Sequence, residues 1–172
     1  MHVLFVCTGN ICRSPTAERL SVAYAKQDSR SDFQASSAGT NALSGYRIHD
    51  EAAAVIQKLG GDPRNFAARQ VTHKLASETD LIITMTKAHR DVVLGLAPRA
   101  LHRTFTLDEA ARLIRDHQAR EIADLSNLRA KLHYNESCDI PDPIGHDSDY
   151  FMTIGSQIAE SVRAVIQLGH RG

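Results

Sequence analysis

The sequence lacks an excess of charge of either sign. Its 20 lysines and arginines are matched by 20 aspartates and glutamates, so the formal net charge is zero. A chain without net charge produces no broad electrostatic field that would attract nucleic acid or an anionic membrane surface. We therefore expect neither of these partners, and any anion-binding site has to be built locally.

Long apolar segments and a set of paired cysteines are missing as well. No segment approaches the roughly 20 apolar residues of a membrane-spanning helix, and the apolar start of the chain, residues 3–6, is too short for the core of a signal peptide. The three cysteines are an odd number, unlike the framework of a secreted disulfide-rich domain. Together these absences predict a cytoplasmic protein whose thiols stay reduced.

The nine histidines are scattered along the chain without the spacing of metal ligands. We expect solvated or capping roles for them, His73 and His89 included. The sequence therefore predicts neither a metal site nor a cofactor.

Strand-like and helix-like segments alternate along the chain. Predicted strands cover residues 2–7, 33–37, 80–85 and 101–107, and predicted helices cover residues 14–27, 50–59, 87–96 and 149–168. Strands separated by helices require crossover connections, which produce a parallel sheet covered on both faces. The predicted fold class is α/β: a single doubly wound domain over residues 1–172, with a four-stranded parallel sheet flanked by helices on both faces.

Residues 108–137 contain no strand-like segment and are rich in Ala, Arg, Asp, Glu and Leu. This composition predicts a helical insertion of one or two exposed helices. Residues 138–146 hold two prolines and a glycine, so they are expected to form a loop.

A cysteine ends the first predicted strand, and an arginine follows six residues later where the first helix begins, as Cys7-Thr8-Gly9-Asn10-Ile11-Cys12-Arg13-Ser14-Pro15. The residues between them can curl so that successive backbone N–H groups point inward and form an anion site, reinforced by the helix N-terminus. Gly9 supplies the backbone freedom for this curl. The planar guanidinium of Arg13 can hold two phosphate oxygens at once.

Such surroundings should lower the pKa of the Cys7 thiol below its ordinary value of about 8.5, leaving a nucleophilic thiolate. Ser14 can cap the helix and hydrogen-bond the departing sulfur. The spacing alone would also fit a buried core thiol followed by a surface arginine. The position directly after the first strand, together with Gly9 and Asn10, favours the phosphate loop.

Residues 7–15 closely resemble the signature loop of the low-molecular-weight protein tyrosine phosphatases. The similarity continues through residues 16–18, 36–39, 68–70, 80–82 and 142–143. The resemblance implies a metal-independent enzyme that hydrolyses phosphotyrosine through a cysteinyl-phosphate intermediate. Its expected partner is a phosphotyrosine-containing protein or a small aryl phosphate, and a monomer is the expected oligomeric state.

Phosphoryl transfer to sulfur also needs a proton for the leaving oxygen, and afterwards a base that activates water; one carboxyl group can serve both steps. The Asp-Pro pair of Asp142 and Pro143 matches the acid of the family. Asp139 is the nearby competitor. We predict Asp142 as the general acid.

The resemblance further implies a network that holds the loop. In the family, a loop asparagine bonds to serines and a histidine, which carries over to Asn10, Ser14 and Ser37. The histidine is missing, because Phe66 stands three residues before Arg69. We expect packing to replace this link.

Cys12 has two interpretations. It is either an inert small residue or, as the family suggests, the partner of Cys7 in a reversible disulfide that protects against peroxide. The redox role is the preferred prediction. Cys138, beside the acid loop, is expected to be a packing thiol.

The predicted substrate-binding residues are Thr8, Gly9, Asn10, Ile11, Cys12, Ser14, Leu43 and Tyr46. An isoleucine at position 11 is similar to the phosphotyrosine type of the family. A threonine at this position would be similar to the arginine phosphatases. Many relatives have an aromatic residue after the Asp-Pro pair, but Ile144 occupies that place. This difference predicts weaker stacking on a substrate ring.

Three alternative functions remain open from the sequence. A protein-arginine phosphatase on the same scaffold is the closest of them. An arsenate reductase would need further relay cysteines, for which only Cys138 is available. A non-catalytic phosphate-binding module would require neither Cys7 nor Asp142.

Overall fold

The computed structural model describes residues 1–132 and 139–169, and it confirms the predicted parallel sheet. Its strands are β1 (His2–Cys7), β2 (Gln34–Gly39), β3 (Leu81–Thr84) and β4 (Thr104–Thr106). They pair in the order β2-β1-β3-β4, and all three pairings are parallel. The chain leaves β1 toward one side for β2 and returns on the other side for β3. This reversal puts the carboxyl end of β1 at the crevice where open α/β sheets bind ligands.

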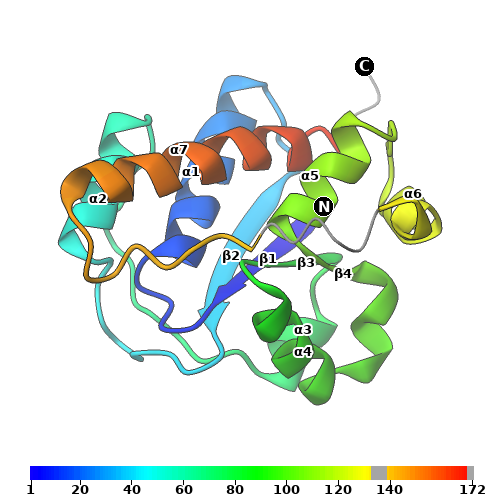
Figure 1. Ribbon diagram of the computed structural model, residues 1–172, viewed down its shortest axis with the longest axis horizontal. Coiled ribbons are helices and arrows are strands. Elements are labelled where there is room, and N and C mark those ends of the chain that lie inside the picture. Colours follow the sequence, from blue (N-terminus) through cyan, green and yellow to red (C-terminus); the bar gives the residue numbers. More distant parts are fainter. Residues whose placement is uncertain (133–138, 170–172) are drawn as a thin grey trace.

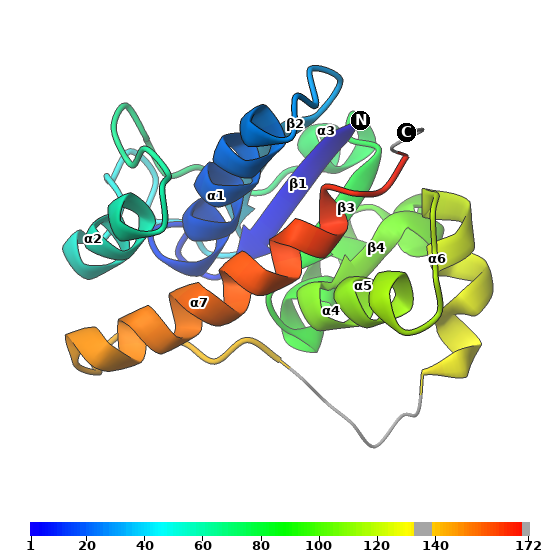
Figure 2. The same cartoon turned by 90° about the horizontal axis from the view of Figure 1, so that it is seen from above.

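The helices of the described residues are α1 (Arg13–Gln27), α2 (Asp50–Lys58), α3 (His73–Ser77), α4 (Lys87–Leu96), α5 (Leu107–Arg115), α6 (Ile122–Leu128) and α7 (Ser148–Val165), with 3-10 turns η1 (Pro98–Arg103) and η2 (Arg129–Lys131). Helices cover both faces of the sheet (Figure 1). α7 lies between α1 and α5 and also contacts α2 (Figure 2).

Alternation along β1 divides the core between the two faces. Val3 and Phe5 pack with α1, α5 and α7, whereas Leu4 and Val6 pack with α3, α4 and η1. All four side chains are fully buried. Because both faces are covered, β1 reads as a continuous apolar run rather than an alternating one.

Two predicted strand boundaries differ from those in the structure, and each difference has a local cause. The fourth strand is limited to Thr104–Thr106, because Pro98 opens the 3-10 turn η1 and leaves Leu101 on the surface. The second strand continues beyond Ser37 to Gly39, where it pairs with Cys7. Helix α3 was not predicted, since five residues are too few to show a periodic pattern.

The expectation of exposed helices in residues 108–137 is wrong for α5. This helix buries Leu107, Ala110 and Leu113 in the main core beneath α7. α6 fits the expectation better, because Leu125 is its only fully buried residue. The end of this segment, residues 133–137, and Cys138 lie outside the described residues.

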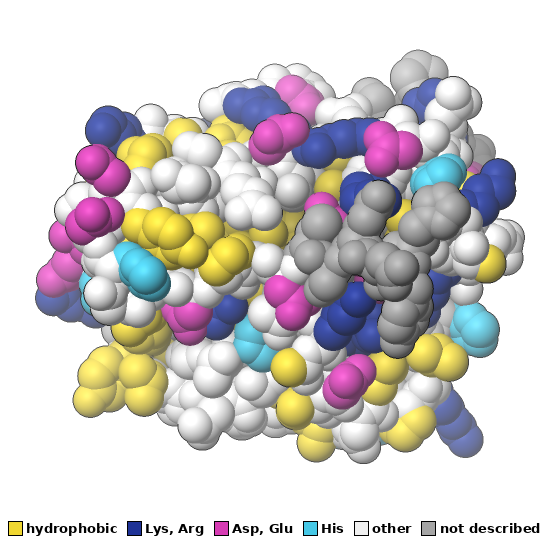
Figure 3. All heavy atoms as spheres, in the orientation of Figure 1, with side chains coloured by type: hydrophobic (Ala, Val, Ile, Leu, Met, Phe, Trp, Pro, Cys, Tyr) yellow, Lys and Arg dark blue, Asp and Glu magenta, His cyan; other side chains and the backbone are white. Residues whose placement is uncertain are grey.

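The surface agrees with the balanced charge of the chain. On the face drawn in Figure 3, basic and acidic side chains are interspersed. In the described part of the chain, no helix combines the length and the apolar character needed to cross a membrane.

A close backbone approach fixes the end of β2 against the loop that follows β1. A Cβ atom added at Gly39 would lie 2.3 Å from the carbonyl oxygen of Thr8. No side chain fits there, so a glycine is required for β2 to reach this loop.

We predict that Gly39→Ala destabilises the fold by about 1–3 kcal/mol, as overpacking against backbone does. Thermal unfolding measures the effect. Gly95→Ala is the matched control, since a Cβ atom there meets nothing within 4 Å and alanine favours a helix by up to about 1 kcal/mol over glycine. A Gly39→Ala protein that melts with the wild type would contradict the close approach.

Candidate active site

The loop between β1 and α1 turns through Asn10, whose φ of 55° lies in the left-handed region. Its side chain is fully buried and makes three hydrogen bonds. Nδ2 donates to Ser14 Oγ and to Ser37 Oγ, each at 2.9 Å, and Oδ1 accepts from the backbone N of Arg69 at 2.8 Å. The structure thus brings together Asn10, Ser14 and Ser37, as the resemblance implied.

Glu18 supplies the support for this network that we expected from packing. Ser37 Oγ donates to Glu18 Oε2 at 2.5 Å. The Glu18 side chain is only 15% exposed, and burial raises the pKa of its carboxyl, opposed by the Ser37 bond and the positive charges of Arg19 and Arg69. The expectation of packing is therefore corrected: a hydrogen bond replaces the missing histidine. Phe66 instead lies under the guanidinium of Arg19, 5.4 Å away.

Cys7 ends β1 with its thiol facing the start of α1. Its Sγ lies 3.0 Å from Ser14 Oγ, and the residue is 3% exposed. Ser14 Oγ accepts from Asn10, and its one hydrogen can be donated either to Sγ at 3.0 Å or to the carbonyl oxygen of Ala38 at 3.4 Å. A hydroxyl group of the first turn of α1 therefore lies next to the sulfur.

Arg13 brings the phosphate loop and the acid loop together. Its NH1 donates to the carbonyl oxygen of Ile140 at 2.9 Å, and its NH2 pairs with Asp142 Oδ2 at 2.8 Å. Arg13 is almost buried, whereas the Asp142 side chain is 49% exposed. The predicted catalytic residues Cys7, Arg13 and Asp142 therefore converge at one end of the sheet.

Asp139 has a different partner from Asp142. Its Oδ1 accepts from the backbone N of Lys87 at 2.9 Å and so caps the first turn of α4. A carboxylate occupied at a helix N-terminus is a structural group. This contact favours Asp142 over Asp139 as the acid.

Of the predicted wall residues, Leu43 and Tyr46 are 45% and 64% exposed. The backbone N of Leu43 donates to the carbonyl oxygen of Gly9 at 3.0 Å, which fastens this wall to the phosphate loop. Ile144, two residues after the acid, is 46% exposed. Leu43, Tyr46 and Ile144 are thus the exposed large apolar side chains on the loops that flank the site.

Cys12 turns its side chain away from solvent. It is 6% exposed and packs in an apolar cluster with Ile48, Val55 and Phe151. Burial, followed by the charges of Cys7 and Asp142, raises the pKa of this thiol far above its usual range. Cys7 and Cys12 are both free cysteines, so the predicted disulfide between them stays a prediction.

His89 was assigned a solvated or capping role, and that prediction is wrong. The residue is 7% exposed, and its Nε2 lies 2.8 Å from Thr8 Oγ1. Burial and the positive charge of Arg13 lower the pKa of His89 to about 4. His89 has no sequence pattern that marks it as part of the site, and the only signal for Glu18 is the family resemblance over residues 16–18.

No group of three or more potential ligand residues among residues 1–132 and 139–169 forms a metal site. The geometry brings a cysteine sulfur, a guanidinium and a carboxyl group into one loop cluster. These are the components of acid-assisted transfer of an anionic group to sulfur.

We predict that Glu18→Ala lowers the melting temperature, because the buried Ser37 hydroxyl loses its acceptor at a cost of about 1–3 kcal/mol, or roughly 3–9 °C for a chain of this size. Glu18→Gln is the control, since its amide oxygen still accepts from Ser37. Equal melting temperatures for Glu18→Ala and the wild type would show that the bond supports nothing.

Comparison with known proteins identifies relatives. Residues 2–127 match the family model described as low molecular weight phosphotyrosine protein phosphatase. Low molecular weight protein-tyrosine-phosphatase Wzb of Escherichia coli K12 is 29% identical over 166 residues, which cover 94% of this chain and 90% of that protein.

Solved structures agree on the fold. The low molecular weight protein tyrosine phosphatase of T. tengcongensis is 26% identical with a TM-score of 0.78, covering 96% of this chain and 97% of that chain. The YwlE arginine phosphatase of Geobacillus stearothermophilus is 22% identical with a TM-score of 0.74, covering 96% and 90%. This second likeness shows the fold alone. The match over residues 2–127 decides the family: the chain belongs to the low molecular weight phosphotyrosine protein phosphatases.

Proposed function

We propose that the protein hydrolyses phosphotyrosine in proteins or small aryl phosphates, with Cys7 as nucleophile, Arg13 as phosphate holder and Asp142 as general acid and base. The observation that carries the proposal is the contact between Arg13 and Asp142 beside the Cys7 loop, with Arg13 NH2 2.8 Å from Asp142 Oδ2. It brings the phosphate-binding charge and the proton donor to one point. A site that only bound phosphate would need no such acid.

In the first step the Cys7 thiolate attacks phosphorus while the bond from phosphorus to the aryl oxygen breaks. The loop amides and Arg13 hold the non-bridging oxygens, so their negative charge is met by fixed donors. Asp142 gives its proton to the departing oxygen, which leaves as the neutral phenol. The products of this step are phosphocysteine and a free carboxylate.

The second step reverses the role of Asp142. Its carboxylate takes a proton from water, the water oxygen attacks phosphorus, and the bond between sulfur and phosphorus breaks. Ser14, at 3.0 Å from Sγ, stabilises the thiolate that departs. Inorganic phosphate leaves, and the thiolate is restored for the next turnover.

Arg13 has two roles in this cycle. Without substrate it pairs with the Asp142 carboxylate; with substrate its fork is taken by phosphate oxygens. The Asp142 carboxyl, released from this pair, can then face the oxygen of the leaving group. Substrate binding thereby frees the proton donor.

The apolar wall supports an aromatic substrate. Leu43, Tyr46 and Ile144 offer exposed apolar surface to a phenyl ring. The tyrosine phosphatase name of the E. coli relative agrees with this preference. We therefore keep the arginine phosphatase as the second candidate, and we place the reaction in the cytoplasm, where free thiols such as Cys7 persist.

We predict that the protein releases phosphate from a phosphotyrosine peptide, in the presence of a chelator, faster than from the matched phosphoarginine peptide. Cys7→Ser should turn over neither, because a hydroxyl is a far weaker nucleophile than a thiolate. Phosphate release is measured directly. Faster release from phosphoarginine would make arginine phosphatase the first candidate function. An active Cys7→Ser protein would contradict the mechanism with Cys7 as nucleophile.

Asp142→Asn should slow turnover by about 100-fold or more for phenyl phosphate, which needs a proton on its leaving oxygen. The loss should be much smaller for p-nitrophenyl phosphate, whose leaving group departs as a stable anion. Asp139→Asn is the matched control, since Asp139 caps α4. The same loss for both esters with Asp142→Asn would mean that another group is the acid.

A further inference from the structure

His89 is a buried titratable group that the proposed reaction does not use. Its ring reaches from α4 to Thr8, the residue directly after the nucleophile, with Nε2 2.8 Å from Thr8 Oγ1. Thr8 is itself exposed at the edge of the loop. This hydrogen bond joins the exposed loop residue Thr8 to a ring that is buried in the protein, and so restrains Thr8 from the protein side.

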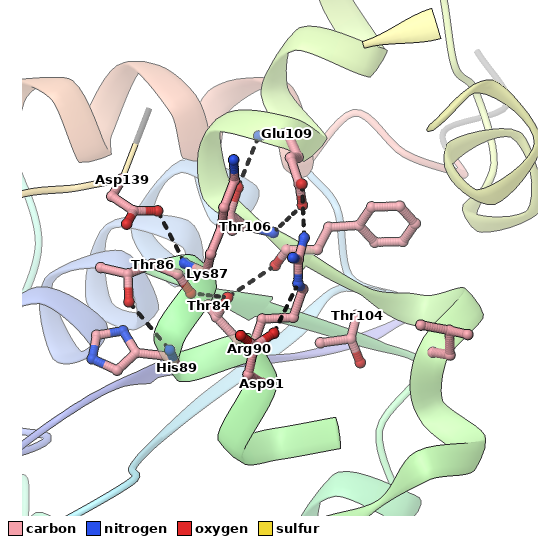
Figure 4. A network of polar contacts seen from close by, with 12 residues as sticks. Thr84, Thr86, Lys87, His89, Arg90, Asp91, Thr104, Thr106, Glu109 and Asp139 are labelled. Carbon is pink, nitrogen blue, oxygen red and sulfur yellow. Dashed lines mark hydrogen bonds and ion pairs between the residues drawn. The ribbon is translucent and has the colours of Figure 1, made fainter. Parts of the chain in front are cut away.

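The first turn of α4 that carries His89 is fixed on several sides. Thr86 Oγ1 accepts from the backbone N of His89 at 3.2 Å, and Asp139 Oδ1 accepts from the backbone N of Lys87 at 2.9 Å. Arg90 pairs with Glu109 of α5 at 2.8 Å. Figure 4 shows the His89 ring pointing away from Arg90 and Glu109. The ring is therefore presented on a rigid support.

The hydrogen-bond pattern assigns the proton on the ring. With a pKa near 4, the ring is neutral at ordinary pH and carries one N–H. Nδ1 is buried and has no hydrogen-bond partner within the described ranges, 1–132 and 139–169. A buried N–H without an acceptor is rarer than an unused lone pair. The proton therefore belongs on Nε2, which donates to Thr8 Oγ1 and leaves the Thr8 hydroxyl hydrogen free to turn toward the site.

The same turn of α4 touches the acid loop. Asp139, which caps it, lies three residues before Asp142 on an extended segment. Ile140, between them, donates its backbone N–H to the carbonyl oxygen of Met85 at the end of β3. The start of α4 thus contacts both loops that supply catalytic groups, through Asp139 on one side and His89 on the other.

We propose that His89 is a positioning residue, which fixes Thr8 by donating from Nε2 and so holds the start of the phosphate loop in register with the acid loop. It touches neither the phosphate nor the leaving group. The inference rests on the proposed function, because its effect is read from phosphatase turnover.

The test is a double-mutant cycle with Thr8→Val and His89→Ala, measured as kcat/KM for an aryl phosphate and as inhibition by inorganic phosphate. Thr8→Val removes the hydroxyl but keeps a β-branched side chain. Each single change should lower kcat/KM about tenfold, the effect of one lost hydrogen bond, and should weaken phosphate inhibition similarly. The double variant should be no slower than either single variant, because both remove the same bond.

His89→Gln should recover most of the activity, since its amide nitrogen reaches the position of Nε2. His73→Ala, which removes an exposed histidine of α3, is the control expected to match the wild type. The inference is overturned if Thr8→Val turns over substrate like the wild type. It is also overturned if the loss of kcat/KM in the double variant equals the product of the losses in the two single variants. If His89→Ala does not fold, Thr8→Val and His89→Gln decide it alone. Absence of turnover in the wild type would instead overturn the proposed function, so the two failures are distinguishable.

Discussion

The left-handed backbone of Asn10 is the constraint on which the site depends. A residue other than glycine in this region costs about 1–2 kcal/mol, and asparagine is among the few side chains that tolerate it. The three buried hydrogen bonds of the Asn10 side chain contribute about 0.5–1.5 kcal/mol each, which is enough to offset that cost. Without them the loop would lose the contacts that hold its turn.

The second feature of the site is the guanidinium of Arg13, which exchanges partners in the proposed mechanism. Arg13 is almost buried and lies within hydrogen-bond distance of both Ile140 and Asp142. A buried cation requires a partner at every stage, so the carboxylate and the phosphate must replace each other. In the proposed mechanism the half-exposed Asp142 turns away from Arg13 and reaches the oxygen that receives its proton. Arg13 stays in place, and the carboxyl group moves.

The sequence allowed the core of this site to be predicted because its residues are close together in the chain. Cys7, Asn10, Arg13 and Ser14 lie in one strand-loop-helix unit, whose geometry follows from local rules. Asp142 was reached through the family resemblance, not through spacing. Glu18 and His89 were missed because their roles depend on tertiary neighbours, Ser37 and Thr8, that no periodicity reveals. The buried face of α5 was missed for a different reason: Leu107, Ala110, Ala111 and Leu113 recur at helical spacing, but the prediction for this segment rested on its composition and not on that spacing.

The central claim is that Arg13 leaves Asp142 for the phosphoryl group while Cys7 bonds to phosphorus. A crystal structure with vanadate, which imitates the five-coordinate phosphorus, tests it most directly. The account predicts Sγ of Cys7 bonded to vanadium, both Arg13 terminal nitrogens on vanadate oxygens, and Asp142 turned toward the apical oxygen opposite the sulfur. Vanadate bound elsewhere, with the ion pair between Arg13 and Asp142 still closed, would contradict it.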